Sequence, residues 1–167
     1  AGTAVTYHLL GVTALDQGKF DEAEECYREA LILREEMGDS GGIADTSHQL
    51  GNLAMAVNRL DEADDWYRKA LALEERLGRV ATQAATLGQL GLLAEMRGDD
   101  AAALDWTVRC LALFSEFPHP LTGPGPRHLA RLTRQLGFGA LEETWQRITG
   151  DPLPQAVRDY VEAGEAE

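Results

Sequence analysis

Two histidines at matching positions are the residues of this sequence best placed for chemistry. His8 and His48 each stand two residues before the leucine of a Leu-Gly pair, and Asp45 precedes His48 by one helical turn. Imidazole and carboxylate groups ligate zinc, and they also exchange hydrogen bonds with a bound molecule. A metal site needs a third ligand and a closer spacing than two neighbouring helical segments supply. The pair therefore favours hydrogen bonding over metal binding.

The short motifs of common enzyme classes are missing from the sequence. It contains no GxxxxGK[ST] phosphate loop, no GxSxG nucleophile elbow and no HExxH zinc helix. The acidic segment GDDAAALD (98–105) stands at a predicted helix start, where capping explains its carboxylates better than acid–base catalysis. We therefore predict a protein that is not an enzyme, with no catalytic residue, metal or cofactor. A metal-dependent enzyme built on the two histidines is the third alternative.

The composition excludes two classes of partner. The formal net charge of -13 repels nucleic-acid phosphates and anionic lipid surfaces. No apolar run approaches the roughly 20 residues that span a bilayer, and no signal peptide opens the sequence. Cys26 and Cys110 stand far apart without a CxxC motif, which is typical of reduced thiols. These features predict a cytoplasmic protein that binds neither nucleic acid nor membrane.

The same pattern of residues occurs three times in the first two-thirds of the sequence. The three copies are spaced by 40 residues, as Gly11, Gly51 and Gly91 show. The same offset aligns four further sets: Leu10, Leu50 and Leu90; Ala14, Ala54 and Ala94; Ala23, Ala63 and Ala103; and Leu31, Leu71 and Leu111. A fixed period of this size is the signature of a stacked solenoid.

Each copy contains two blocks of helical periodicity separated by a turn signal. The signals are Gly18-Lys19, Asn58-Arg59 and Gly98-Asp99, and acidic residues follow each of them, as expected at a helix N-terminus. Each copy is therefore predicted to form two antiparallel helices. We expect the shared glycines and alanines to let the two helix backbones approach closely. Tyr27 and Tyr67 are expected to fill the space between one hairpin and the next.

This pattern resembles the tetratricopeptide repeat (TPR) family. The first copy carries it in Leu10-Gly11, Ala14, Gly18, Phe20, Ala23, Tyr27 and Ala30, and the second in Leu50-Gly51, Ala54, Leu60, Ala63, Tyr67 and Ala70. The third copy departs from it at Asp100, Thr107 and Cys110. The period resembles the longer subfamily of kinesin light chains, polarity adaptors and bacterial regulatory ATPases. The resemblance implies an all-α, right-handed superhelical solenoid of three helix-turn-helix hairpins with a C-terminal helical cap.

The domain organisation follows from the repeat and from the segment that ends it. Residues 1–117 are expected to hold the three repeats, at about 3–40, 41–80 and 81–117. The Pro- and Gly-rich segment 118–126 should stop the helix and act as a linker, because proline lacks an amide donor. Residues 127–164 are predicted to form a degenerate helix pair and a capping helix, and residues 165–167 a disordered tail.

In this family the first helix of each hairpin lines a concave groove, and the resemblance implies a peptide-binding site there. We call the side chains expected to face it the predicted groove residues: His8, Val12, Leu15, Asp45, His48, Asn52, Met55, Gln89, Leu92 and Met96. Only Asn52 matches the family members that grip a C-terminal carboxylate. The acidic side chains of the second helices, including Glu24 and Asp64, are interpreted as a solvated outer face.

The predicted function is a non-catalytic module that binds a protein or peptide. The start of the sequence without methionine and its Arg- and Ala-rich composition suggest a fragment, a sensor or adaptor array, of a larger bacterial signalling protein. The alternative is a self-association scaffold, in which the first hairpin or the C-terminal cap pairs with another copy to give a homodimer.

Overall fold

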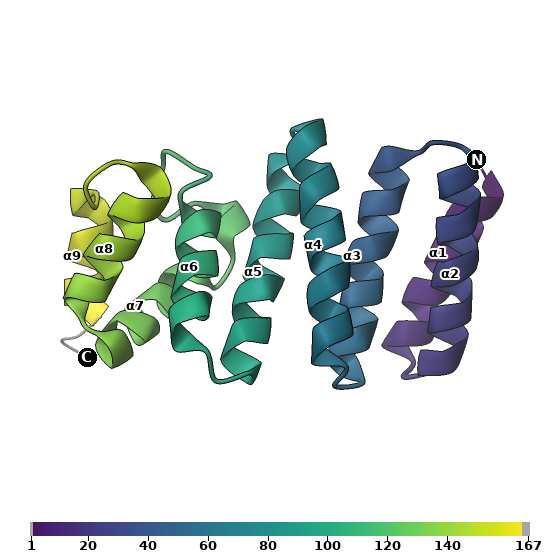
Figure 1. Cartoon of the computed structure of the whole chain (residues 1–167), viewed down its shortest axis with the longest axis horizontal. Coiled ribbons are helices and arrows are strands. Elements are labelled where there is room, and N and C mark those ends of the chain that lie inside the picture. Colours follow the sequence, from purple (N-terminus) through teal and green to yellow (C-terminus); the bar gives the residue numbers. More distant parts are fainter. Residues whose placement is uncertain (1, 165–167) are drawn as a thin grey trace. The chain divides into compact units, whose positions relative to one another are not determined.

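A computed structural model describes residues 2–164, and within this range it contains nine α-helices, one short 3-10 helix and no strand (Figure 1). The predicted all-α class is confirmed. Contacts divide the chain into two compact units, one ending at Arg79 and the other beginning at Val80, and each is described by itself. The predicted disordered tail, 165–167, lies outside the described residues.

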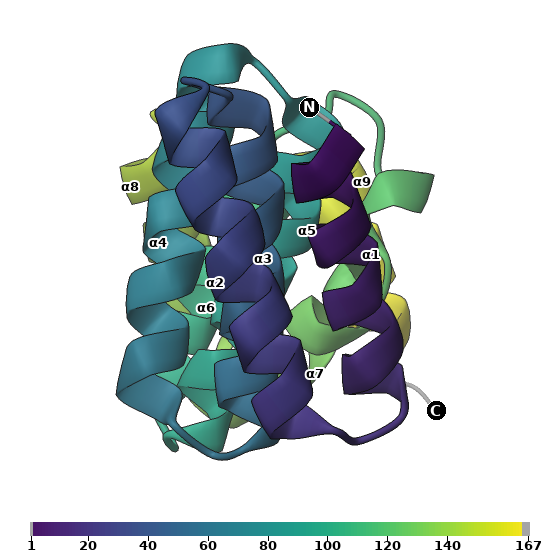
Figure 2. The same ribbon diagram turned by 90° about the vertical axis from the view of Figure 1, so that its right-hand side faces the viewer.

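The first unit consists of two helical hairpins. Helices α1 (Gly2–Asp16) and α2 (Phe20–Glu36) form one, and α3 (Ser40–Ala56) and α4 (Leu60–Leu77) form the other. Helix α2 also packs against α3, which joins the two hairpins. The first helices, α1 and α3, run in the same direction (Figures 1 and 2). Side chains that repeat at an offset of 40 therefore occupy equivalent places in the two hairpins.

The turns lie where the sequence predicts them. Gly18 adopts φ +72° and Asn58 adopts φ +59° between the two helices of their hairpins. This left-handed conformation costs glycine little and asparagine less than most other side chains, which explains the residue types. Asp21 and Asp61 then lie in the first turns of α2 and α4, where the helix dipole stabilises negative charge.

Two of the three shared glycines, Gly11 and Gly51, have a different physical reason from the predicted one. A Cβ atom added at Gly11 would lie 2.6 Å from the ring of Tyr27, and one at Gly51 would lie 2.6 Å from the ring of Tyr67. The glycine therefore makes room for a tyrosine ring of its own hairpin rather than for a helix backbone. The Tyr27 ring also belongs to the cluster of apolar side chains that links the hairpins: Ala14, Ala23, Tyr27, Leu31, Leu50 and Leu53.

The second unit begins with a third hairpin and ends with three further helices. The hairpin is α5 (Val80–Met96) with α6 (Asp100–Leu111), and the others are α7 (Gly125–Leu136), α8 (Phe138–Thr149) and α9 (Gln155–Gly164). Helices α7 and α8 pack on α6, and α9 packs on α7. Their core consists of Ala94, Ala103, Leu104, Val108, Leu111, Leu129, Leu132, Leu141, Trp145, Val157 and Val161. The C-terminal helices thus cover the side of the hairpin that a following repeat would occupy.

The segment between α6 and α7 differs from the predicted linker. Helix α6 ends at Leu111, before the first proline of the segment, and α7 already begins at Gly125. Phe117 lies in the loop after α6 and packs against the core of the second unit. Its ring centre is 5.4 Å from that of Tyr160. A 3-10 turn, η1 (Pro120–Thr122), contacts α5. The segment is therefore a packed part of the second unit.

Candidate functional site

Helix α1 carries exposed apolar side chains on one face. Val5 is 49% exposed and Leu9 58% exposed, whereas Ala4 and Ala14 on the opposite face are buried. His8 is half-buried beside them. Residues 5, 9 and 12 follow one another at spacings of four and three, so they share a face of the helix. We call Val5, Leu9 and Val12 the α1 stripe.

Two predicted groove residues of α1 contribute mainly to packing. Val12 and Leu15 are half-buried and pack against the apolar cluster that links the two hairpins. Their contact area for a ligand is accordingly limited. Val5 and Leu9 are more exposed than either, although they were not among the predicted groove residues. The repeat offset could have found them, because they match Asp45 and Gln49 of the second copy.

His8 belongs to a polar cluster between the hairpins. Its ring centre lies 5.8 Å from that of Tyr27, and its Nδ1 lies 3.5 Å from both Arg34 Nη1 and Thr46 Oγ1. Burial lowers the pKa of His8, the positive charge of Arg34 lowers it further, and Asp45 opposes both effects. The imidazole is therefore held in its neutral form at neutral pH, in which it can accept a hydrogen bond.

Arg34 fixes this cluster to the second hairpin. Its side chain is 6% exposed, and Nη1 donates to the carbonyl of Gly42 at 2.6 Å and to the hydroxyl of Thr46 at 2.5 Å. These charge-assisted bonds connect α2 with α3. The cluster around His8 consequently has a structural role in stacking the hairpins, in addition to any contact with a ligand.

The equivalent group in the second hairpin is satisfied within the hairpin. The His48 and Tyr67 ring centres lie 5.6 Å apart, and the Tyr67 hydroxyl donates to Asn52 Oδ1 at 2.7 Å. Asn52 Nδ2 donates to Gln49 Oε1 at 3.0 Å. An amide nitrogen has two hydrogens, so Asn52 keeps one donor for a bound chain. Burial lowers the pKa of His48, and Asp45 opposes the shift.

The remaining predicted groove residues of the first unit have modest exposure. Asp45 Oδ1 forms an ion pair of 2.8 Å with Arg79 Nη1, and Met55 is half-buried. The carboxylate is thus already partnered at the edge of the hairpin. The first unit brings His8, Asp45 and His48 into one electrostatic neighbourhood, since the charge of Asp45 affects both imidazoles.

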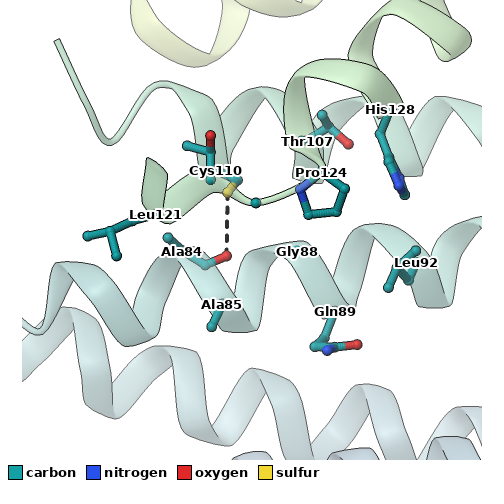
Figure 3. Close-up of a pocket in the computed structure, with 13 residues that line it drawn as sticks. Ala84, Ala85, Gly88, Gln89, Leu92, Thr107, Cys110, Leu121, Pro124 and His128 are labelled. Carbon is teal, nitrogen blue, oxygen red and sulfur yellow. Dashed lines mark hydrogen bonds between the residues drawn. The ribbon is translucent and has the colours of Figure 1, made fainter. Parts of the chain in front are cut away.

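In the second unit, Met96 is exposed, and Gln89 and Leu92 line a cavity of about 280 Å³ (Figure 3). The cavity lies between α5, α6, η1 and the start of α7. Its walls are formed by small and apolar residues with a few polar groups: Ala84, Ala85, Gly88, Gln89, Leu92, Thr107, Cys110, Leu121, Thr122, Gly123, Pro124, Gly125 and His128. Sequence reasoning did not predict this cavity.

Two ionisable groups of the cavity wall, Cys110 and His128, are engaged in contacts within the chain. Cys110 Sγ donates to the carbonyl of Ala84 at 3.4 Å, and burial raises the pKa of its thiol to about 11. The thiol is therefore neutral and a poor nucleophile. His128 Nδ1 lies 3.1 Å from Glu95 Oε1, which also forms an ion pair of 2.6 Å with Arg131 Nη2. Such a wall suits reversible binding better than covalent chemistry.

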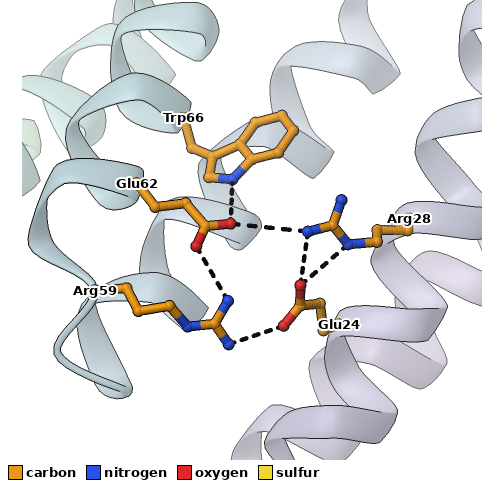
Figure 4. Close-up of polar contacts among 5 residues, drawn as sticks. All are labelled: Glu24, Arg28, Arg59, Glu62 and Trp66. Carbon is orange, nitrogen blue, oxygen red and sulfur yellow. Dashed lines mark hydrogen bonds and ion pairs between the residues drawn. The ribbon is translucent and has the colours of Figure 1, made fainter.

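The outer face of the first unit carries an ion-pair network rather than isolated carboxylates. Glu24 contacts Arg28 at 2.7 Å and Arg59 at 2.9 Å, and Arg59 reaches Glu62 at 3.0 Å (Figure 4). Glu62 also accepts a bond of 3.3 Å from Trp66 Nε1. The interpretation of Glu24 as merely solvated was wrong, because arginines of both hairpins converge on it.

Neither a metal site nor a membrane helix is found in the described part of the chain. Within residues 2–164, His, Cys, Asp and Glu side chains form no group of three or more that could hold a metal ion. Across the same residues, no helix combines the length and the apolar character that a membrane crossing requires.

Comparison with known proteins identifies the repeats. Residues 3–37 and residues 42–116 each match a tetratricopeptide repeat family model. No curated protein sequence matches the chain.

Solved structures share the fold over nearly the whole chain. The crystal structure of BtubC (BKLC) from P. vanneervenii has a TM-score of 0.72 at 21% identity; the match covers 98% of this chain and 65% of that one. A candidate kinesin light chain from Podosopora anserina with nearly identical TPR-like repeats gives a TM-score of 0.66 at 17% identity, covering 97% and 87%. This chain therefore spans less than two-thirds of the BtubC chain. The helical-repeat solenoid is thus confirmed, and the chain belongs to the tetratricopeptide repeat family.

Proposed function

We propose that the chain is a non-catalytic recognition module that binds a protein segment along the first helices of its hairpins. Repeats of this family typically bind proteins or peptides. The observation that carries the proposal is the α1 stripe, where Val5 and Leu9 remain about half exposed on a well-packed helix. Contiguous exposed apolar patches rimmed by polar residues mark interaction surfaces, and Val5 and Leu9 lie one turn apart on the same face.

Polar side chains of the first helices favour an uncharged or basic segment. Asn52 retains one amide donor for a peptide carbonyl, and the neutral His8, whose Nδ1 faces the donor Arg34, can donate a hydrogen bond from Nε2 to a second carbonyl. The net charge of -13 attracts positively charged segments and repels acidic ones at a distance. A partner with apolar anchors and few carboxylates fits this surface.

The finer expectations form part of the same proposal. They are a sensor or adaptor array within a larger bacterial signalling protein, and a location in the cytoplasm. The free thiols of Cys26 and Cys110 support a reducing environment. The likeness to kinesin-light-chain-type repeats supports an adaptor rather than an enzyme.

A random-peptide display library selected on the chain tests the proposal directly. Peptides that bind the wild type should bind a Val5→Ser/Leu9→Ser variant at least about tenfold more weakly, a loss of roughly 1.4 kcal/mol. Ile32→Ser is the matched control, since Ile32 is 50% exposed but lies on the second helix. Failure to select any peptide, or equal loss in the control, would contradict binding at the first helices.

One observation favours self-association as a second candidate function. Leu10 is 51% exposed, whereas the equivalent Leu50 and Leu90 are 2% and 1% exposed. Leu50 packs on the first hairpin. Leu10 thus offers the same apolar contact to another hairpin, including that of a second copy. Sedimentation velocity over a range of concentrations tests this, with Leu10→Glu as the disrupting variant; a monomer at every concentration removes the candidate.

A further inference from the structure

The third hairpin lacks two rings that the first two share. Tyr27 packs on Gly11 and beside His8, and Tyr67 packs on Gly51 and beside His48. At the same offset of 40, Tyr67 corresponds to Thr107 and His48 to Gly88. The short hydroxyl side chain of Thr107 thus replaces the phenol ring. Gly88, which has no side chain, replaces the imidazole ring.

The volume of the missing rings is left open. Gly88 and Thr107 both line the cavity of about 280 Å³. The glycine that receives the ring in the other hairpins is kept as Gly91, where an added Cβ atom would meet nothing closer than Thr107 Oγ1 at 3.6 Å. The start of α7 and η1 supply part of the wall but no aromatic side chain other than His128. The third hairpin therefore keeps the place for a ring without providing one.

We propose that this cavity receives one aromatic ring of the bound partner, in the place that Tyr67 and His48 fill in the second hairpin. The inference rests on the proposed function, since the partner's side chain carries the ring. An apolar cavity of about 150 Å³ already binds benzene, so this one accommodates a substituted or a bicyclic ring. Its size lies at the lower end of ligand pockets and suits a single side chain better than a larger ligand.

The wall chemistry agrees with an aromatic ligand. Ala84, Ala85 and Leu92 provide apolar contacts, and the neutral sulfur of Cys110 is a favourable neighbour for a ring. Flat rings bury much apolar surface with few rotatable bonds, so they bind such a cavity at a low entropic cost.

Free rings test the cavity without any knowledge of the partner. We expect 4-methylphenol to cause saturable amide shifts at Gly88, Gly123 and Gly125 in nuclear magnetic resonance spectra of the whole chain, with a Kd of about 1 mM. Toluene should bind with a similar affinity, because the cavity wall contacts the ring mainly through apolar groups. Absence of saturable shifts at these glycines with any of the rings overturns the proposal.

Filling the cavity should remove the binding. Gly88→His/Thr107→Tyr restores the residues that the other hairpins carry, and we expect at least about a tenfold weaker affinity for 4-methylphenol. Ala85→Trp is a second variant that covers the cavity from an exposed position on α5, and Ala81→Trp, on the same helix outside the cavity, is its control. Unchanged affinity in a folded blocking variant contradicts the assignment.

Peptide display distinguishes a partner's ring from a free small molecule. Peptides selected on the wild type should share an aromatic residue at one position, and selection on the filled variant should lose this preference. If no peptide is selected but 4-methylphenol binds, the proposed function fails and the ring site remains. If peptides bind with no aromatic preference, the proposed function stands and the partner's ring is excluded.

Discussion

The second and third hairpins have the same arrangement of two helices but differ in the side chains that pack between them. Both keep the Leu-Gly pair and the small alanines that hold two helices together. In the second hairpin, Tyr67 occupies the space above Gly51 and bonds to Asn52. In the third, Thr107 leaves that space open, and Leu92 replaces the amide. Helix pairing therefore depends on the small residues, while the tyrosine position varies without loss of the hairpin.

This difference separates packing from recognition within one repeat pattern. The rings of the first two hairpins make contacts inside the first unit, and the exposed face of α1 is the ligand surface that we propose there. The third hairpin instead borders a cavity that opens to solvent beside the exposed Ala85 and Gly88. Variants that exchange the two arrangements measure what each contributes, and the largest effect concerns the glycine beneath the ring.

Gly51→Ala should strongly destabilise the first unit. Its Cβ atom would lie 2.6 Å from the Tyr67 ring, so the ring or the helix must shift. Overpacking of this kind costs about 1–3 kcal/mol. Gly91→Ala has no contact closer than 3.6 Å and should stabilise its helix by roughly 0.5–1 kcal/mol, because alanine is the better helix former. Urea unfolding of both variants measures the contrast.

A double variant tests the cause of that loss. In Gly51→Ala/Tyr67→Thr the new methyl group no longer meets a ring, so the two changes should cost less together than the sum of their separate effects. Strictly additive free energies of unfolding would show that the ring is not what excludes a side chain at position 51.

The fold could be predicted from the sequence because the repeat encodes it locally. The offset of 40 residues locates the hairpins, and Gly18 and Asn58 mark turns that the structure contains. The reason for Gly11 and Gly51 was not predictable in the same way. A glycine on a helix face fits both a backbone contact and a ring contact, and only the folded structure shows that the Tyr27 ring lies against it.

The candidate site was predicted less completely. The helices that carry it followed from the family pattern, but the exposure of Val5 and Leu9 depends on which neighbours cover α1. The cavity depends on η1 and the start of α7, whose packing on α5 and α6 has no periodic signal. Comparison of Tyr67 with Thr107 along the repeat could have indicated an open space, but not that the following segment leaves it unfilled.

The hydroxyl groups of the two tyrosines should contribute unequally. Tyr67→Phe removes the 2.7 Å bond to Asn52 and should reduce stability by about 0.5–1.5 kcal/mol. Tyr27 has a buried hydroxyl with no hydrogen-bond partner in the described part of the chain, so Tyr27→Phe should be neutral or slightly stabilising. Urea midpoints of the two variants decide the matter; equal losses would contradict the hydrogen-bond assignment.

The histidines of the first two hairpins should make stability depend on pH, unlike Gly88 of the third. Burial and Arg34 lower the pKa of His8, so the unfolded chain binds its proton at higher pH than the folded one does. Stability should be full above the unfolded pKa of about 6.5 and should fall with acid until the lowered folded pKa is passed. His8→Gln should reduce this slope by less than one proton, measured by urea unfolding across the window; an unchanged slope would assign the effect to other groups.

The ion-pair network of the outer face should give the smallest effect. Hydrogen bonds from Arg59 and Arg28 lower the pKa of Glu24. The stability that its charge contributes to the fold is therefore present above the unfolded pKa of about 4.3, and it is lost as pH falls through the lower folded pKa. Glu24→Gln should cost about 0.5 kcal/mol at neutral pH, as exposed pairs do, and less in concentrated salt. Glu25→Gln, on the same helix and exposed, is the matched control. If the Glu24→Gln variant loses the same free energy of unfolding at neutral pH and in acid, Glu24 acts through packing. The two hairpins would then be joined on this face by contacts of the apolar parts of these side chains rather than by their charges.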